Sequence, residues 1–182
     1  MRRQFPNRNR QAKTSYDTKE LTAEQIRTKA FDSAIRFLAA KPCSVGELRE
    51  KLSQRRVDAK LVDEIVGRLR EYGYLDDDRF ASSYAASKVK QKPVGRRRLE
   101  QELKMRKVES TVADRALEGF FEETSEEELI DRAVEKRVRT RGRPKNRLEA
   151  KSLFDHLLRL GFPFDLVSDR VRAVSSINTT EE

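Results

Sequence analysis

A leucine repeat constrains the fold of this chain more than any other feature of its sequence. Leu52, Leu103 and Leu157 stand 51 and 54 residues apart, and each follows another leucine by four residues. Apolar residues also recur at equivalent positions after each of the three leucines. A period of about 50 residues indicates an array of stacked units, whose long outer surface is free for binding. The sequence therefore favours a binding surface over an enclosed pocket.

Within each repeat, apolar residues follow the spacing of α-helices. Ser44 and Glu47 have the spacing of a capping box at the start of a second helix, and Gly73 is expected to end the third in the left-handed conformation. No segment convincingly predicts a strand. We expect an all-α fold, with three tandem three-helix units in an elongated array that can be straight or curved. The predicted divisions are a disordered basic tail (1–22), units one to three (23–75, 76–124 and 125–175) and a disordered C-terminal tail (176–182).

Composition limits the functions that are open to the chain. Charged residues make up 39% of it and the net charge is +9, which favours a polyanionic partner or an acidic protein surface. The single cysteine, Cys43, excludes an intrachain disulfide framework and fits a reducing compartment. No uncharged apolar stretch approaches the roughly 20 residues that cross a bilayer. We expect a cytoplasmic, monomeric protein with no membrane anchor.

Charge is arranged in blocks. Residues 84–108 and 132–151 each hold nine bases and two acids, whereas residues 109–131 between them hold nine acids and one base. The basic blocks occupy equivalent places in units two and three, so we expect them to lie along one face unless the units rotate apart. The candidate binding residues are Lys88, Lys90, Lys92, Arg96, Arg97, Arg98, Arg139, Arg141, Arg143, Lys145 and Arg147.

Two interpretations of these basic blocks are open. Bases in turns and at helix starts suit phosphate or carboxylate contact, because backbone N–H groups add to the side chains. Alternatively, the blocks form a solvated face that pairs with the acidic residues between them. Aromatic residues are not interleaved with the bases, which argues against recognition of single strands by base stacking.

The residue types needed for catalysis are scattered. Three successive acids (Asp76, Asp77 and Asp78) resemble a metal site, but adjacent residues of a helix diverge too far to face one ion, so we interpret them as helix-capping acids. Cys43 and His156, the only thiol and the only imidazole, fall in different units. The sequence predicts no enzyme, no metal site and no cofactor.

A nine-residue segment carries a family resemblance. Its sequence, G-Y-L-D-D-D-R-F-A, resembles the G-Y-[LI]-D-D-x-[RK]-[FY]-A signature of RecX, the bacterial regulator of the RecA recombinase. Motifs beginning at Ser44 and Gly95 resemble the family's flanking motifs, and the match runs from about residue 30 to residue 174. The signature residues, which we interpret as mostly structural, are Gly73, Tyr74, Leu75, Asp76, Asp77, Arg79, Phe80 and Ala81.

The chain departs from the family pattern at two turns. Arg56 and Lys107 stand where the family usually has glycine, and only Gly161 remains in the third unit. Because non-glycine residues are sterically disfavoured at positive φ, the first two turns are not expected to be left-handed. The two tyrosines of the junction, Tyr72 and Tyr74, are interpreted as packing between units one and two.

The resemblance implies that the chain binds the RecA–DNA filament in its helical groove. It also implies inhibition of ATP hydrolysis, strand exchange and co-protease activity, and hence a role in DNA repair, homologous recombination and the SOS response. Two other hypotheses remain open. One is a DNA-binding transcriptional regulator, because a three-helix unit can resemble a helix-turn-helix. The other is a metal-dependent nuclease that uses the acidic runs.

Overall fold

The computed structural model describes residues 22–175. The predicted tails lie outside this range, apart from Thr22, which caps the first helix. Within the range every regular element is an α-helix, and none of them is long and apolar enough to cross a membrane. The helices are α1 (Ala23–Ala40), α2 (Val45–Gln54), α3 (Ala59–Glu71), α4 (Asp77–Gln91), α5 (Arg96–Met105), α6 (Ser110–Glu123), α7 (Glu126–Arg141), α8 (Arg147–Arg159) and α9 (Phe164–Val174).

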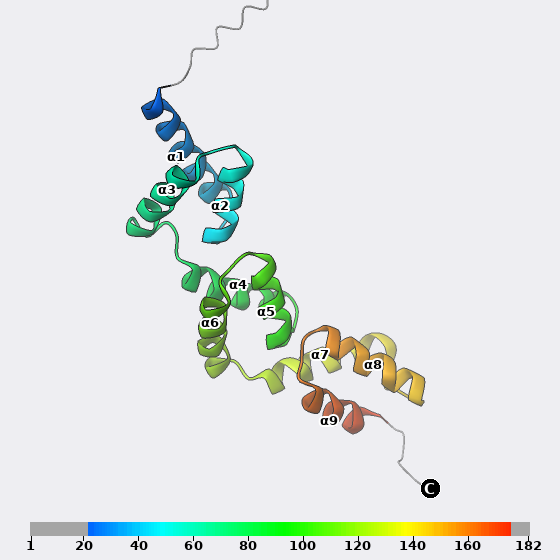
Figure 1. Cartoon of the computed structure of the whole chain (residues 1–182). Helices are drawn as coiled ribbons and strands as arrows, with labels where there is room; N and C mark the ends of the chain where they lie inside the picture. The colour runs from blue at the N-terminus through cyan, green and yellow to red at the C-terminus, as the bar shows by residue number, and fades with distance from the viewer. Residues whose placement is uncertain (1–21, 176–182) are drawn as a thin grey trace, which may run out of the picture.

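The helices form an elongated array of three successive groups, with α1–α3 at one end, α4–α6 in the middle and α7–α9 at the other end (Figure 1). Contacts between helices are concentrated within these groups, as between α4 and α6 or α8 and α9. The all-α fold of tandem three-helix units is therefore confirmed. We refer to the groups as units one, two and three; the residue boundaries given above stay a prediction.

The leucines of the repeat form the core of each unit. Leu52, Leu103 and Leu157 have no exposed surface. The buried side chains of unit one make a cluster of their own, whereas those of units two and three form one continuous cluster. Since protein interiors are close-packed, a shared core holds its elements in a fixed relation. Units two and three therefore pack as a single body, and unit one adjoins it.

Helix starts follow the capping chemistry that the sequence predicts. Ser44 Oγ accepts a hydrogen bond from the backbone N–H of Glu47 at 3.0 Å, and the Glu47 carboxylate accepts one from the N–H of Ser44 at 3.3 Å. The predicted capping box is thus confirmed. Asp76 caps α4 and Ser125 caps α7 in the same manner, through a side-chain oxygen that accepts from the backbone N–H three residues later.

Two turns correct the sequence analysis. Gly73 has a φ of +70°, as expected, but Arg56 and Lys107 are also left-handed, each with a φ of 59°. Both follow a second helix whose end is closed by paired hydrogen bonds; after α5, Lys107 and Val108 donate to the carbonyls of Lys104 and Leu103 at 2.9 and 3.1 Å. These bonds and the burial of Val108 offset the cost of about 1–2 kcal/mol for a side chain at positive φ.

A repeated joint connects neighbouring units. The carboxylate of Asp77, at the start of α4, accepts a hydrogen bond from the N–H of Val45, at the start of α2, at 2.8 Å. Glu126, at the start of α7, accepts one from the N–H of Arg96, at the start of α5, also at 2.8 Å. Each carboxylate thus satisfies a free N–H at a helix start, where negative charge is favoured. Burial raises the pKa of both carboxyl groups, and the N–H donors act in the opposite direction.

Close backbone approach at glycine completes each joint. A Cβ atom added to Gly95 would lie 2.5 Å from the carbonyl oxygen of Gly161, in the turn between α8 and α9. The N–H of Gly95 donates to the carbonyl of Leu160 at 2.9 Å across the same joint. Gly46 meets the backbone of Lys107 in the equivalent way between units one and two. Both joints therefore require a residue without a side chain at the start of the second helix.

Replacing Leu103 by alanine tests the core. We expect Leu103→Ala to lower the free energy of unfolding by about 2–5 kcal/mol, because it removes buried methyl groups and leaves a cavity. The matched control is Met105→Ala, since Met105 is 66% exposed at the end of the same helix. Its effect should stay within about 0.5 kcal/mol. Urea unfolding followed by circular dichroism measures both variants, and equal effects would contradict the assignment of Leu103 to the core.

Replacing Gly95 by alanine tests the joint between units two and three. We expect Gly95→Ala to destabilise the protein by about 1–3 kcal/mol, because the facing atoms are backbone atoms and cannot move aside easily. The control is Gly119→Ala in α6, where an added Cβ meets no atom within 4 Å. That substitution should stabilise by about 0.4–1 kcal/mol through the unfolded chain. The same unfolding measurement gives the sign of the change in unfolding free energy for each variant. A stabilising effect of Gly95→Ala would refute the close approach.

Candidate functional site

A basic groove lies between units two and three. It is a recess of about 400 Å³, lined by α4, by the chain that connects it to α5, by α5 itself and by the end of α8. Unit two and unit three therefore both contribute side chains to it. We use the name basic groove for the recess around six charged or titratable residues: Lys88, Lys92, Arg98, Glu102, His156 and Arg159.

Glu102 organises the unit-two side of the basic groove. Its side chain is only 9% exposed. One carboxylate oxygen accepts from Arg98 Nε at 2.9 Å, and the other lies 2.8 Å from Lys88 Nζ and accepts from the Tyr84 hydroxyl at 2.7 Å. Burial by itself would raise the pKa of Glu102, but the hydrogen bonds from Lys88, Tyr84 and Arg98 outweigh it and the pKa lies below 4.5. Glu102 is thus ionised and fixes two cations at the recess.

Two other cations of the basic groove have no acidic partner. Within residues 22–175, neither Lys92 nor Arg159 forms a salt bridge, and both are exposed. Arg137 and Arg141, from the end of α7, extend the positive charge on the unit-three side, where they line a neighbouring recess of about 220 Å³. Burial, followed by the charges of Arg141 and Arg159, lowers the pKa of Arg137. Positive charge thus exceeds negative charge around the recess.

The pKa of His156 is affected by this positive charge. Burial lowers its pKa below the ordinary value of 6.5, and the positive charges of Arg137, Lys92, Arg159 and Arg141 lower it further. The imidazole is therefore neutral at pH 7. Sequence reasoning considered His156 only as a catalytic residue. Its place on α8, beside the end of α4 in the neighbouring unit, comes from the joint and could not be read from spacing along the chain.

The other predicted binding residues are distributed around this centre. Arg96 pairs with Glu100 one turn along α5, at 3.2 Å, as a surface ion pair. The remaining candidates are exposed on α4, on α5, and from the end of α7 to the start of α8: Lys90, Arg97, Arg139, Arg143, Lys145 and Arg147. Sequence reasoning missed Arg137 and Arg159, because Arg137 was counted within a block but not selected and Arg159 lies outside both blocks. Whether any of these residues binds a partner stays a prediction.

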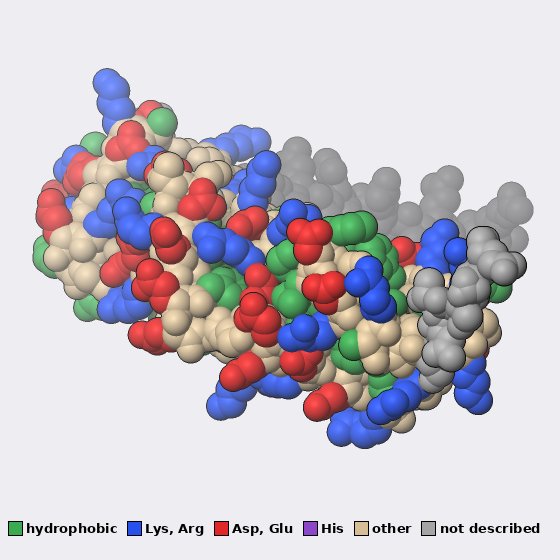
Figure 2. Space-filling model, turned by 90° about the horizontal axis from the view of Figure 1, so that it is seen from below, with side chains coloured by type: hydrophobic (Ala, Val, Ile, Leu, Met, Phe, Trp, Pro, Cys, Tyr) green, Lys and Arg blue, Asp and Glu red, His purple; other side chains and the backbone are tan. Residues whose placement is uncertain are grey.

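On one face of the array the basic side chains do not form a continuous strip. Seen from below, Lys and Arg side chains are interspersed with Asp and Glu side chains, and apolar side chains form an area among them (Figure 2). Basic side chains on this face are therefore interrupted by acidic ones. A basic surface has to be sought elsewhere on the array, and the basic groove is one location where bases from two units meet.

The signature segment separates into structural roles. Leu75 and Ala81 are buried, Asp76 caps α4, and the Arg79 guanidinium donates to the carbonyl of Gly73 at 2.8 Å. Asp77 departs from the capping interpretation, because its carboxylate reaches α2 of unit one and does not cap its own helix.

Beside them, Asp78 forms a salt bridge with Arg115 of α6. The three neighbouring carboxylates thus serve three different partners, as their divergence along a helix requires.

The junction tyrosines differ from the prediction that they pack between units one and two. Tyr72 and Tyr74 are 58% and 60% exposed, so that prediction is wrong.

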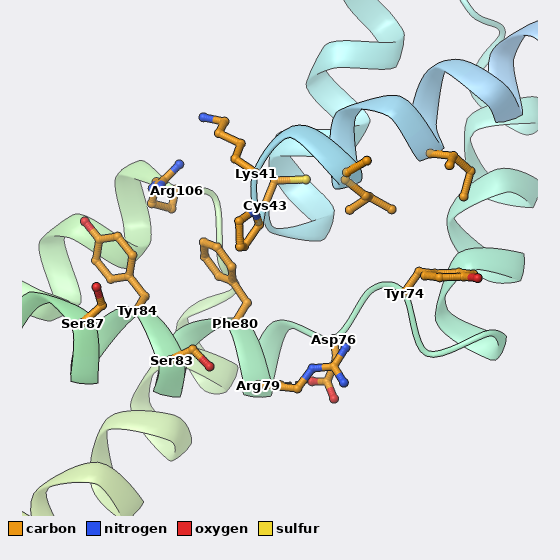
Figure 3. Close-up of a pocket in the computed structure, with 14 residues that line it drawn as sticks. Lys41, Cys43, Tyr74, Asp76, Arg79, Phe80, Ser83, Tyr84, Ser87 and Arg106 are labelled. Carbon is orange, nitrogen blue, oxygen red and sulfur yellow. Dashed lines mark hydrogen bonds between the residues drawn. The ribbon is translucent and has the colours of Figure 1, made fainter.

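A second recess, of about 650 Å³, lies between units one and two. Phe80 and Tyr84 rise from α4 toward the chain segment that carries Lys41 and Cys43, with Arg106 beside Tyr84 (Figure 3). The Arg106 guanidinium lies 5.7 and 5.4 Å from the ring centres of Phe80 and Tyr84. Burial raises the pKa of the Cys43 thiol, which favours its protonated form. This recess is mainly apolar and differs in chemistry from the basic groove.

Known proteins with similar sequences and structures agree on one family. Models of the first and second three-helix domains of RecX match residues 30–69 and 76–117. The regulatory protein RecX of Chlorobaculum tepidum is 30% identical over 151 residues, which cover 83% of this chain and 91% of that protein. The Treponema pallidum protein of the same name is 38% identical over 109 residues, covering 60% of this chain and 66% of that one.

The crystal structure of RecX from Lactobacillus salivarius has the same fold. It superimposes with a TM-score of 0.73 and covers 83% of this chain and 97% of that one, at 18% sequence identity. Fold and site together define the class: an all-helical repeat protein with a recess at each joint between its units. Within that class, the chain belongs to the RecX family of regulatory proteins.

Glu102 gives a prediction that depends on pH. Because its pKa is lower in the folded state, its ionised form stabilises the fold above the unfolded-state pKa, and this contribution is lost as the pH falls through the folded-state value. We expect Glu102→Gln to lower the free energy of unfolding at pH 7 by about 1–3 kcal/mol. The difference from the unsubstituted protein should shrink as the pH falls below 4.5.

The control for Glu102 is Glu100→Gln, which removes an acid of similar position but in an exposed ion pair. Exposed pairs contribute about 0–1 kcal/mol, so the effect of this control should be small at every pH. Urea unfolding between pH 3 and pH 7 distinguishes the two variants. A loss for Glu102→Gln that did not change with pH would show that its charge is not what stabilises the fold.

Proposed function

We propose that this protein is a non-enzymatic modulator, mainly a negative regulator, of the RecA recombinase. In this proposal it binds the RecA–DNA filament and inhibits ATP hydrolysis, strand exchange and co-protease activity. Membership of the RecX family is the observation that carries the proposal. In this proposal the protein acts in the cytoplasm, as a monomer and without a cofactor. Inhibition is steric and allosteric, without any bond made or broken.

The shape of the array supports binding to a polymer. Helices of 10 to 18 residues are about 15–27 Å long, and the three units follow one another along an elongated body. Such a body can contact more than one subunit of a filament at once. Linked weak contacts gain affinity because, after the first, the others form intramolecularly. The shared core of units two and three supports this mode, because it keeps two of the binding units in register.

Basic residues of units two and three are the proposed contacts. The candidates of the two basic blocks are exposed or partly exposed, and some of them surround the basic groove. Unit one, which is nearly neutral over residues 21–83, does not share this surface. We propose that the units divide the work, with units two and three contacting charged surface and unit one contacting the recombinase.

A helix-turn-helix transcriptional regulator has less support. In that motif the last helix of the unit enters the major groove and needs a surface compatible with phosphate. Here α6 exposes Asp114, Glu118, Glu122 and Glu123 against one base, Arg115. The last helices of the other units, α3 and α9, hold as many acids as bases. A sequence-selective footprint on duplex DNA in the absence of recombinase would favour this alternative.

ATP hydrolysis tests the proposed function. We expect the protein to suppress DNA-dependent ATP hydrolysis by RecA at sub-stoichiometric amounts, because one elongated molecule affects several filament subunits. The assay follows phosphate release on single-stranded DNA as the protein is titrated, with the Leu103→Ala variant heated past its unfolding transition as the control for non-specific protein. A rate unchanged at equimolar protein would rule the proposal out.

A further inference from the structure

The basic groove has the construction of a site and not of a chance collection of surface bases. Glu102 holds Lys88 and Arg98 at 2.8 and 2.9 Å, and Tyr84 completes the carboxylate's hydrogen bonds. Two of the groove's cations are therefore positioned before any partner arrives. A pre-positioned cation loses less conformational freedom on binding, and this raises affinity.

The walls of the groove are fixed in the same way. Unit two and unit three share one core, the N–H of Gly95 donates to the carbonyl of Leu160, and Glu126 accepts from the N–H of Arg96. These contacts belong to the joint between units two and three, so the relation between the two walls is set by the fold. Lys92 on one wall and Arg159 on the other then point positive charge at a common space.

The charge of the groove identifies its ligand as an anion. Four bases line it against one carboxylate, and that carboxylate has its hydrogen-bond capacity occupied by Lys88, Arg98 and Tyr84. Neither Lys92 nor Arg159 has an ion-pair partner in the described part of the chain. Like charges that line one recess favour a counter-charge, which an anion bound between these two side chains supplies.

The lining also indicates which kind of anion fits. No Phe, Tyr or Trp side chain lines the groove, so it offers no large aromatic platform for a stacked base. Its volume of about 400 Å³ exceeds that of one phosphate group and accommodates a phosphate with the adjoining sugar. Arg and Lys on facing walls suit the oxygens of a phosphodiester, which positions a strand without reading its sequence.

We propose that the basic groove binds the backbone phosphates of a nucleic-acid strand, with Lys92 and Arg159 as the principal contacts. Lys88 and Arg98, held by Glu102, extend the contact on the unit-two wall. This inference rests on the proposed function for its biological setting, because the filament carries such a strand. It is tested without the recombinase, so that the two ideas can fail separately.

His156 adds a dependence on pH. The charged groups around it are Lys88 from α4, Lys92 just after α4, Arg98 and Glu102 from α5, Arg137 and Arg141 from α7, and Arg159 from α8. Burial and the surrounding positive charges both oppose protonation of the imidazole, and a phosphodiester among them neutralises these charges. Binding then takes up a proton, and the affinity rises as the pH falls from 7.5 toward 6. Replacing His156 by glutamine abolishes this dependence.

The experiment measures binding of a labelled single-stranded oligonucleotide of mixed sequence by fluorescence anisotropy at low salt. Arg159→Glu is expected to weaken binding at least tenfold, and Arg159→Ala to reduce the slope of log affinity against log salt by about 1. The matched control is Arg172→Glu, an equal charge reversal in the same unit on α9, where Arg172 is 76% exposed. This control should change the affinity less than about twofold, apart from the general effect of net charge.

The outcomes separate the possible ligands. Equal affinities for Arg159→Glu and Arg172→Glu overturn the proposal. The proposal is also overturned if Arg159→Glu keeps its affinity for the oligonucleotide but binds DNA-free recombinase more weakly. The groove would then bind an acidic protein surface. Inorganic phosphate that competes no better than chloride at equal ionic strength supports a polymeric strand. Competition at micromolar phosphate assigns the groove to a free anion instead and overturns the proposal.

Folding is controlled independently. Circular dichroism confirms helix content for each variant, and Lys92→Glu provides a second reversal from the opposite wall if Arg159→Glu unfolds. If the unsubstituted protein binds the oligonucleotide through the groove but leaves recombinase activity unchanged, the proposed function fails and the phosphate site stands. If the unsubstituted protein suppresses the recombinase but Arg159→Glu binds the oligonucleotide normally, the phosphate site fails and the proposed function stands.

Discussion

This array depends on one hydrogen bond that is repeated at each joint. It links a carboxylate at the start of one unit to the backbone N–H at the start of the second helix of the preceding unit. It occurs twice, from Asp77 to Val45 and from Glu126 to Arg96, with the same length. Units of about 50 residues bury too little surface to be very stable alone. A joint that satisfies exposed backbone groups and brings glycine against backbone at the same place sets both the spacing and the direction of the next unit.

The two joints share this chemistry but differ in what surrounds them. At the joint of units two and three the apolar cores merge, whereas unit one keeps a separate core and adds polar contacts. Those contacts include the ion pairs of Arg106 with Glu47 and of Lys107 with Glu50, at 2.6 and 2.8 Å. Polar interfaces of this kind are typical of units that can move relative to one another. The array thus combines a two-unit body with one shared apolar core, which carries the basic groove, with a first unit that is attached through polar contacts.

Much of the fold was predictable from the sequence, because the leucine repeat and the capping residues act locally. The helical spacing, the Ser44 capping box and the left-handed Gly73 all depend on residues a few positions apart. The left-handed Arg56 and Lys107 were not predictable in this way. Their conformation follows from the hydrogen bonds and packing that close the turn, and these outweigh a local steric preference.

The candidate site was predictable only in part, because it is assembled across a joint. The basic block of unit two indicated Lys88, Lys92 and Arg98, but nothing in the spacing indicated that Arg159 and His156 would face them. Asp77 was assigned to its own helix because local capping is the simpler use of an acid at that position. Contacts between units depend on the angle at which units stack, and a sequence repeat gives the period of an array but not its angle.

Electron microscopy of the protein bound to RecA filaments on single-stranded DNA tests the central claim most directly. The claim is that units two and three form one rigid body whose basic groove faces the nucleic acid. The account predicts density in which these two units keep the arrangement of Figure 1 and the side with Lys92 and Arg159 lies nearest the DNA strand. Density in which units two and three separate, or in which the basic groove faces solvent, would contradict it.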